Sequence, residues 1–197
     1  NEQIKPSHTY YVLDTSGSMR GERLNDLIRA MDNLAGGDNS LTGQFARFRN
    51  REKVTILPFN SQVIDTSDFE VDSSNPGSYK QISDTIHSLQ AEGNTAIFLA
   101  LQDGYNLALQ ASQKEPDRIY SIVLMTDGEN NSGISENDFT NFYQSTSGLH
   151  NIRTFTVLFG EANADVLKSI ADLTGGRMFD ASEDSLSFIF KEIRGYQ

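Results

Sequence analysis

The sequence YYVLDTSGS, at residues 10–18, joins an apolar run to a polar turn. The run at residues 9–13 is nearly continuous in apolar character, which is typical of a strand covered on both faces. Apolar residues at helical spacing follow the turn, so the stretch predicts a strand, a turn and a helix. The turn carries the Asp14 carboxylate and the hydroxyls of Ser16 and Ser18. Hard divalent cations prefer such an oxygen-only set of ligands.

The same alternation of strand and helix patterns continues along the chain. Strands are expected at residues 9–13, 53–59, 121–126 and 153–159, with shorter ones at 61–65, as an edge strand, and at 177–180. Helices are expected around residues 24–34, 82–89, 97–109, 139–143, 166–170 and 186–193, and a turn at 71–78. This alternation predicts an α/β fold: a doubly wound, Rossmann-like sheet of about six strands, mostly parallel with one antiparallel edge strand, and helices on both faces.

Length and composition fit one globular domain. The chain has 197 residues, of which 37% are hydrophobic and 22% are charged, enough for a sizeable core. No apolar run approaches the length of a membrane-spanning helix, and residues 1–6 lack the apolar segment of a signal peptide. We expect residues 1–197 to form a single domain. Because the sequence does not begin with Met, we expect it to have been cut from a longer protein.

Charge and cysteine content exclude several functions. The formal net charge of −11 argues against nucleic acid and anionic membrane surfaces as partners, since binding phosphates needs clustered Lys and Arg. Cysteine is absent, which excludes disulfides and thiolate ligands. The three histidines lie far apart in the sequence, so we expect no histidine metal site and no histidine base.

One segment of the chain is basic. Residues 45–53 interleave two aromatic residues with four cations: Phe45, Arg47, Phe48, Arg49, Arg51 and Lys53. A nucleic-acid patch is one interpretation. We favour the other, in which the aromatic side chains enter the core while the arginines stay solvated, because the whole chain is acidic.

Two further oxygen-bearing residues extend the first motif. Thr95 lies in a segment that opens a predicted helix, and Asp127 follows the predicted strand at 121–126. In doubly wound sheets, ligands bind beyond the carboxyl ends of the strands, where the strand order reverses. If the strands before Asp14 and Asp127 are neighbours there, both carboxylates meet in one crevice. The alternative for the first motif is an ordinary helix-capping turn, in which Ser and Asp are common.

These five residues carry a family resemblance. In this order along the chain, Asp14, Ser16, Ser18, Thr95 and Asp127 match the metal-ion-dependent adhesion site of the von Willebrand factor type A domain, which the sequence resembles in its bacterial form. That site is built from Asp-x-Ser-x-Ser, a Thr on a second loop and an Asp on a third. The alternation of strands and helices is similar to the family over residues 9–193. The resemblance implies that the serines and, in one state, the threonine contact the metal, while the aspartates act mainly through water.

The resemblance implies a binding module and not an enzyme. If neutral hydroxyls are most of its direct ligands, a bound Mg²⁺ or Mn²⁺ keeps an under-compensated charge and attracts a carboxylate from outside. The expected partner is a protein or peptide that supplies an Asp or Glu, in adhesion or another interaction. Ca²⁺ is less favoured, because small hydroxyl-rich sites suit smaller ions. The family also implies that the C-terminal helix, residues 185–193, can shift when the metal changes ligands.

Two other functions stay open: a Mg²⁺-dependent enzyme of phosphoryl transfer, and a scaffold that keeps only the fold within a larger assembly. Some phosphatases begin with strand-Asp-x-Asp, but here Ser16 occupies the position of the second Asp. The phosphate-loop and Gly-x-Ser-x-Gly patterns are also absent from the sequence. The scaffold is disfavoured because buried carboxylates without a partner are costly.

The residues next to the motif in the sequence allow two interpretations. They either tune partner choice or serve only as loop and cap residues: Met19, Arg20, Gly21, Glu129, Asn130 and Asn131. The likeness to bacterial members favours an extracytoplasmic or cell-surface setting over a cytoplasmic one.

Overall fold

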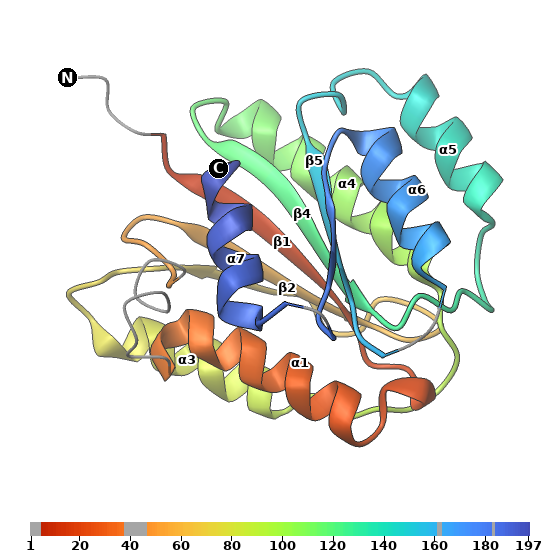
Figure 1. Ribbon diagram of the computed structural model, residues 1–197. Helices are drawn as coiled ribbons and strands as arrows, with labels where there is room; N and C mark the ends of the chain where they lie inside the picture. The colour runs from red at the N-terminus through yellow and green to blue at the C-terminus, as the bar shows by residue number, and fades with distance from the viewer. Residues whose placement is uncertain (1–4, 38–46, 161–162, 183) are drawn as a thin grey trace.

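The computed structural model describes residues 5–37, 47–160, 163–182 and 184–197. Within these residues, a central sheet has helices on both faces (Figure 1). The strands are β1 (Ser7–Asp14), β2 (Lys53–Phe59), β3 (Ser67–Glu70), β4 (Ile119–Thr126), β5 (Arg153–Leu158) and β6 (Met178–Asp180). The α-helices are α1 (Glu22–Asp32), α3 (Pro76–His87), α4 (Ile97–Lys114), α5 (Glu136–Ser145), α6 (Ala164–Thr174) and α7 (Leu186–Gly195). A short 3-10 helix, η1 (Gly17–Met19), precedes α1, and a π-helical turn, η2 (Asn33–Gly37), follows it.

The strand order confirms the expected fold class. The order is β3-β2-β1-β4-β5-β6, and every neighbouring pair is parallel except the antiparallel pair of β2 and β3. The chain adds β2 on one side of β1 and later adds β4 on the other side. The order therefore reverses between β1 and β4, which is where such sheets bind ligands.

The antiparallel edge strand lies further along the chain than the sequence pattern predicts. It is β3, at Ser67–Glu70, and not residues 61–65, which make an isolated bridge to β2. In that earlier segment the Ile64 N–H donates back to the Pro58 carbonyl at 2.7 Å, and Asp65 has a positive φ of 26°. The segment is used to reverse the chain, so pairing along β2 begins only after it.

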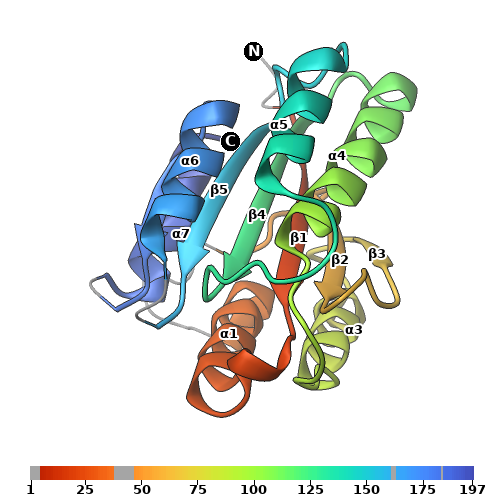
Figure 2. The ribbon, with the colours of Figure 1, turned by 90° about the vertical axis from the view of Figure 1, so that its right-hand side faces the viewer.

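The two faces of the sheet bury separate sets of apolar side chains. Along β1, Tyr11 and Leu13 pack with α1, α3 and α7, whereas Tyr10 and Val12 pack with α4, α5 and α6. Figures 1 and 2 show these two helix layers on either side of the sheet. Burying one such large apolar side chain contributes about 1.5–3 kcal/mol, so both layers hold the strand ends in place. Among the described helices, none combines the length and the apolar character that crossing a membrane requires.

The turn expected at residues 71–78 is shorter than the pattern predicts. Helix α3 begins at Pro76, and the side chain of its N-cap residue, Asn75, accepts a hydrogen bond from the Gly77 N–H at 3.0 Å. Proline suits the first helical position because an N–H there has no partner within the helix. The end of the expected turn is therefore the first turn of α3.

The basic segment before β2 serves the core. The Phe48 ring is 2% exposed and meets the Tyr11 ring edge-on, with 5.7 Å between the ring centroids. Arg49 and Arg51 are exposed. The favoured interpretation of this segment is confirmed for these residues but not for Arg47, which is half-buried with its guanidinium 4.9 Å from the centroid of the Tyr79 ring. Phe45 lies outside the described part of the chain.

Candidate metal centre

Asp14 ends β1 at the point where the strand order reverses. Leu13 pairs with Met125 of β4 in parallel register, which brings Asp14 level with Thr126. The Thr126 hydroxyl donates a hydrogen bond to Asp14 Oδ2 at 2.7 Å, and the Ser16 N–H donates to Asp14 Oδ1 at 2.8 Å. The carboxylate is fully buried, with both oxygens held. Figure 2 shows the ends of β1 and β4 above the start of α1.

The environment of Asp14 disfavours its negative charge. Burial raises the pKa of the Asp14 carboxyl above its ordinary value, and hydrogen bonds from Ser16 and Thr126 oppose this rise. The neighbouring Asp127 carboxylate raises the pKa of Asp14 further. Two buried carboxylates near each other are costly unless a positive charge compensates them.

The two serines of the motif follow Asp14 on one short turn. Ser16 is the N-cap of η1, and the Met19 N–H donates to its carbonyl at 3.0 Å. This turn brings Ser16 Oγ within 3.2 Å of Ser18 Oγ. Ser16 is fully buried, whereas Ser18 is exposed. The two hydroxyls therefore lie side by side between the buried Asp14 and the protein surface.

Thr95 lies in the loop just before α4, which begins at Ile97, the predicted start of this helix. Its N–H donates to the Asn131 side-chain carbonyl at 2.8 Å, and its own carbonyl accepts from the Asn131 N–H at 2.9 Å. The Asn130 side chain caps α4 by accepting from the Ile97 N–H at 2.9 Å. Asn130 thus caps the helix and Asn131 holds the loop of Thr95, while a role of either residue in partner choice stays a prediction. The Thr95 residue is 2% exposed. Among the described residues its hydroxyl makes no hydrogen bond, and the hydroxyl oxygen is not one of the buried polar atoms left without a partner, so it keeps some contact with solvent.

Asp127 follows β4 and is fully buried. Its Oδ1 accepts from the Glu129 N–H at 3.3 Å, and its Oδ2 accepts from Arg23 Nη1 at 3.2 Å. Gly128 allows the tight turn after it: its φ is +88°, and a Cβ there would lie 2.9 Å from the Asn163 carbonyl oxygen. The chain therefore turns sharply at Gly128 and leaves Asp127 at the end of β4.

Backbone and side-chain hydrogen bonds join the loops that carry the five residues. The Gly17 N–H donates to the Gly93 carbonyl at 2.9 Å, which joins the first loop to the second. The bonds between Thr95 and Asn131 join the second loop to the third, and the Thr126 hydroxyl joins the third to Asp14. The predicted site residues thus come from three loops that the fold holds together, although the side chains of Thr95 and Asp127 make no hydrogen bond to the serines in the described structure.

The donor chemistry fits a hard divalent cation. The five side chains offer carboxylate and hydroxyl oxygens, the ligands that Mg²⁺ takes while keeping several waters. The Thr95 hydroxyl makes no hydrogen bond to the described residues, so its oxygen is available to a ligand. In the described part of the chain, no three His, Cys, Asp or Glu side chains gather into a metal site. A cation at this position would therefore depend on the hydroxyls as much as on the two carboxylates.

Sequence reasoning missed two residues that contact the site. Thr126 holds Asp14, and Arg23 pairs with Asp127. Thr126 has a detectable signal, since it is the hydroxyl residue directly before Asp127 at the end of an apolar strand. Arg23 is unusual as a cation in the first turn of a helix, where the helix dipole disfavours it, but that position does not indicate which residue it contacts.

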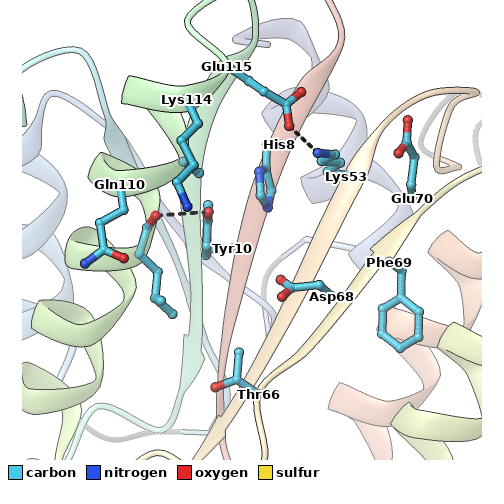
Figure 3. Close-up of a pocket in the computed structure, with 12 residues that line it drawn as sticks. His8, Tyr10, Lys53, Thr66, Asp68, Phe69, Glu70, Gln110, Lys114 and Glu115 are labelled. Carbon is cyan, nitrogen blue, oxygen red and sulfur yellow. Dashed lines mark hydrogen bonds and ion pairs between the residues drawn. The ribbon is translucent and has the colours of Figure 1, made fainter.

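A separate cavity of about 440 Å³ lies on the α4 side of the sheet, beside β3. None of the five predicted site residues lines it. In Figure 3, His8 and Tyr10 stack side by side, and Lys53 reaches toward Glu115. Of the charged groups here, Lys53 pairs with Glu115, and the His8 ring bonds to the Thr55 hydroxyl at 2.8 Å. The proposed metal ligands lie at the other end of β1, beyond Asp14.

Residues 10–192 match the von Willebrand factor type A domain. The match covers most of the chain, so the chain belongs to this family. It is 28% identical over 175 residues to the uncharacterised protein sll0103 of Synechocystis sp., covering 88% of this chain and 37% of that protein. The chain thus spans little more than a third of that relative's length.

Solved structures share the fold. A von Willebrand factor type A protein from Catenulispora acidiphila superimposes with a TM-score of 0.72 at 18% identity, over 96% of this chain and 42% of that one. Proximal thread matrix protein 1 from the mussel byssus, described with a zinc-occupied adhesion-site motif, superimposes with a TM-score of 0.67 at 17% identity. The match covers 96% of this chain and 47% of that one. At these identities the likeness concerns the fold alone.

Proposed function

We propose that this domain binds Mg²⁺ or Mn²⁺ and uses the bound cation to capture an acidic side chain of a protein or peptide partner. The proposed ligands are Asp14, Ser16, Ser18, Thr95 and Asp127. The observation that carries the proposal is the joining of their three loops at the reversal of the strand order, with two buried carboxylates and three side-chain hydroxyls on those loops. Such a set has the chemistry of a small oxygen site.

Each residue has a role that follows from its place. Asp14 and Asp127 supply the negative charge, and their backbone and hydroxyl donors fix their orientation. Ser16 and Ser18 offer two adjacent hydroxyls between the buried carboxylate and the surface, and Thr95 offers a third from the second loop. When bound, the cation supplies a positive centre with a coordination position open to a carboxylate. The exposure of Ser18 leaves that side of the site accessible to a partner.

Family membership supports an interaction role. Von Willebrand factor type A domains are commonly adhesion or interaction modules, in general not enzymes, and often bind a divalent metal. The zinc-occupied motif described for the mussel byssus protein supports a metal at the corresponding place in the fold.

A peptide selection tests the capture of carboxylates. Binders would be selected from a random peptide library on the immobilised domain in Mg²⁺, and each would be compared with its Glu→Gln or Asp→Asn version and in EDTA. We expect binding that needs an acidic residue, needs the metal and is lost in Asp14→Ala. Asp172→Asn, at the far end of α6, is the control and should bind normally. Peptides that bind equally in EDTA or without their acidic residue would instead support a scaffold or a metal-free interaction.

A further inference from the structure

Arg23 forms an ion pair inside the candidate metal centre. Its Nη1 lies 3.2 Å from Asp127 Oδ2, and the side chains of the two residues are 38% and 0% exposed. Asp127 is one of the two carboxylates that a cation at this centre would need. A protein cation therefore already compensates the charge of a proposed metal ligand.

Local helix stability does not explain this arginine. Arg23 is in the first turn of α1, where the positive end of the helix dipole disfavours a cation. The nearby Glu22 has the charge that suits this position. A role in the site, paired with Asp127, accounts for the arginine at a place where the helix itself favours an acid.

The fold also leaves a defined space for the guanidinium group. Gly160 follows β5, has a φ of +85°, and comes so close to Arg23 that a Cβ there would lie 2.6 Å from the arginine Nε. Any larger residue at Gly160 would displace the arginine side chain. The guanidinium thus lies against the loop that follows β5 while it pairs with Asp127, which follows β4.

We propose that Arg23 is a resident counter-cation of Asp127 that competes with the divalent metal and so lowers the affinity of the site for it. This inference rests on the proposed metal site and concerns its regulation. With both carboxylates ionised, as ligands of a metal are, Asp14, Asp127 and Arg23 together carry one net negative charge, whereas the two carboxylates alone carry two. The site therefore stays partly neutralised without metal, and a metal that binds must share Asp127 with the guanidinium.

Calorimetric titration of Mg²⁺ into metal-stripped protein tests this directly. We expect Arg23→Gln to bind Mg²⁺ about three- to tenfold more tightly than wild type, the size of effect that one partly exposed unit charge typically produces. Arg23→Lys, which keeps the charge, should stay within about twofold. Arg29→Gln makes the same change of charge on the same helix, where Arg29 pairs with the exposed Asp26, and should also stay within about twofold. Equal or weaker binding by Arg23→Gln would overturn the proposal.

Thermal melting gives a second readout that does not depend on measuring affinity. In EDTA, Arg23→Gln should melt below wild type, because Asp127 loses its counter-charge. In saturating Mg²⁺ most of that difference in melting temperature should disappear, because the bound metal then compensates the charge of Asp127. The same loss of melting temperature in both conditions would mean that Arg23 is only a structural contact, and would overturn the competition.

Asp14→Ala in the same series separates this inference from the proposed function. If wild type binds Mg²⁺, Asp14→Ala does not, and Arg23→Gln equals wild type, then the metal site stands and the role of Arg23 fails. If no variant binds Mg²⁺, then the proposed function fails and the competition fails with it.

Discussion

The Thr126 hydroxyl donates a 2.7 Å hydrogen bond to Asp14 Oδ2, across two neighbouring strands and 112 residues of sequence. Both residues are fully buried. The same hydroxyl oxygen accepts from the Gly128 N–H at 3.1 Å, so it links Asp14 to the turn that follows Asp127. One buried hydroxyl thus holds the two loops that carry the proposed carboxylate ligands.

Thr126→Val removes this hydroxyl and nearly preserves the volume of the side chain. We expect a loss of about 1–3 kcal/mol in the free energy of unfolding, because Asp14 and the Gly128 N–H each lose a partner in a buried place. Mg²⁺ affinity should fall by about tenfold, because supporting residues of this kind orient metal ligands. Thr126→Ser keeps the hydroxyl and should retain most of the affinity. Normal stability and affinity in Thr126→Val would show that the bond does not organise the site.

Gly128→Ala should distort the turn after Asp127. The new Cβ would lie 2.9 Å from the Asn163 carbonyl oxygen, at a φ of +88°. We expect a loss of about 2–4 kcal/mol, since backbone strain and a steric contact add. Gly175→Ala is the matched control: it has a φ of +73° but nothing within 4 Å, so it should cost only about 1 kcal/mol. Urea unfolding compares the two, and equal losses would mean that the contact with Asn163 has no effect.

A buried ion pair should anchor the C-terminal helix. Arg194 near the end of α7 pairs with Glu52, which precedes β2, and their side chains are 5% and 2% exposed. Glu52→Gln removes the carboxylate that compensates the buried guanidinium, and should lower the free energy of unfolding by about 3–5 kcal/mol. Glu192→Gln, on the same helix, breaks the exposed pair with Arg177 and should cost less than about 1 kcal/mol. Similar losses in the two variants would argue against the anchor.

His8 should make stability depend on pH. Burial, with a smaller contribution from the Lys53 charge, lowers the pKa of His8 from 6.5 to about 4, although Asp68 opposes the change. Below pH 6.5 the unfolded chain takes up a proton at His8 that the folded protein does not, so stability falls as the pH drops through this window. Between pH 7 and pH 5 the loss from His8 is about 2 kcal/mol.

His8→Gln should remove this part of the pH dependence. Urea unfolding of wild type and variant at pH 7 and pH 5 would measure it. The same fall in both proteins would show that His8 does not titrate as its burial implies. The Thr55 hydroxyl donates to Asp68 at 2.6 Å, so it accepts from Nε2–H of the neutral His8 ring, and glutamine can supply a similar donor.

The fold was largely predictable because buried parallel strands appear in the sequence as continuous apolar runs. Those runs predict β1, β2, β4 and β5, and the carboxylates of Asp14, at the end of β1, and Asp127, just after β4, indicate the candidate site. The edge strand was predicted at the wrong place, because β3 is half exposed and includes Asp68 and Glu70, so it has no apolar run. The contact between Arg23 and Asp127 joins residues 104 apart, and it depends on where α1 lies relative to β4, which no local pattern encodes.

The most direct test of the metal site is a calorimetric titration of Mg²⁺ into the metal-stripped protein, with Asp14→Ala and Asp172→Asn beside it. Wild type and Asp172→Asn should bind one ion per chain with the same affinity, and Asp14→Ala should lose most of that affinity because it removes a buried charge at the site. Saturable binding that Asp14→Ala leaves unchanged would contradict the assignment of the five residues. An absence of binding in wild type would contradict the metal site itself.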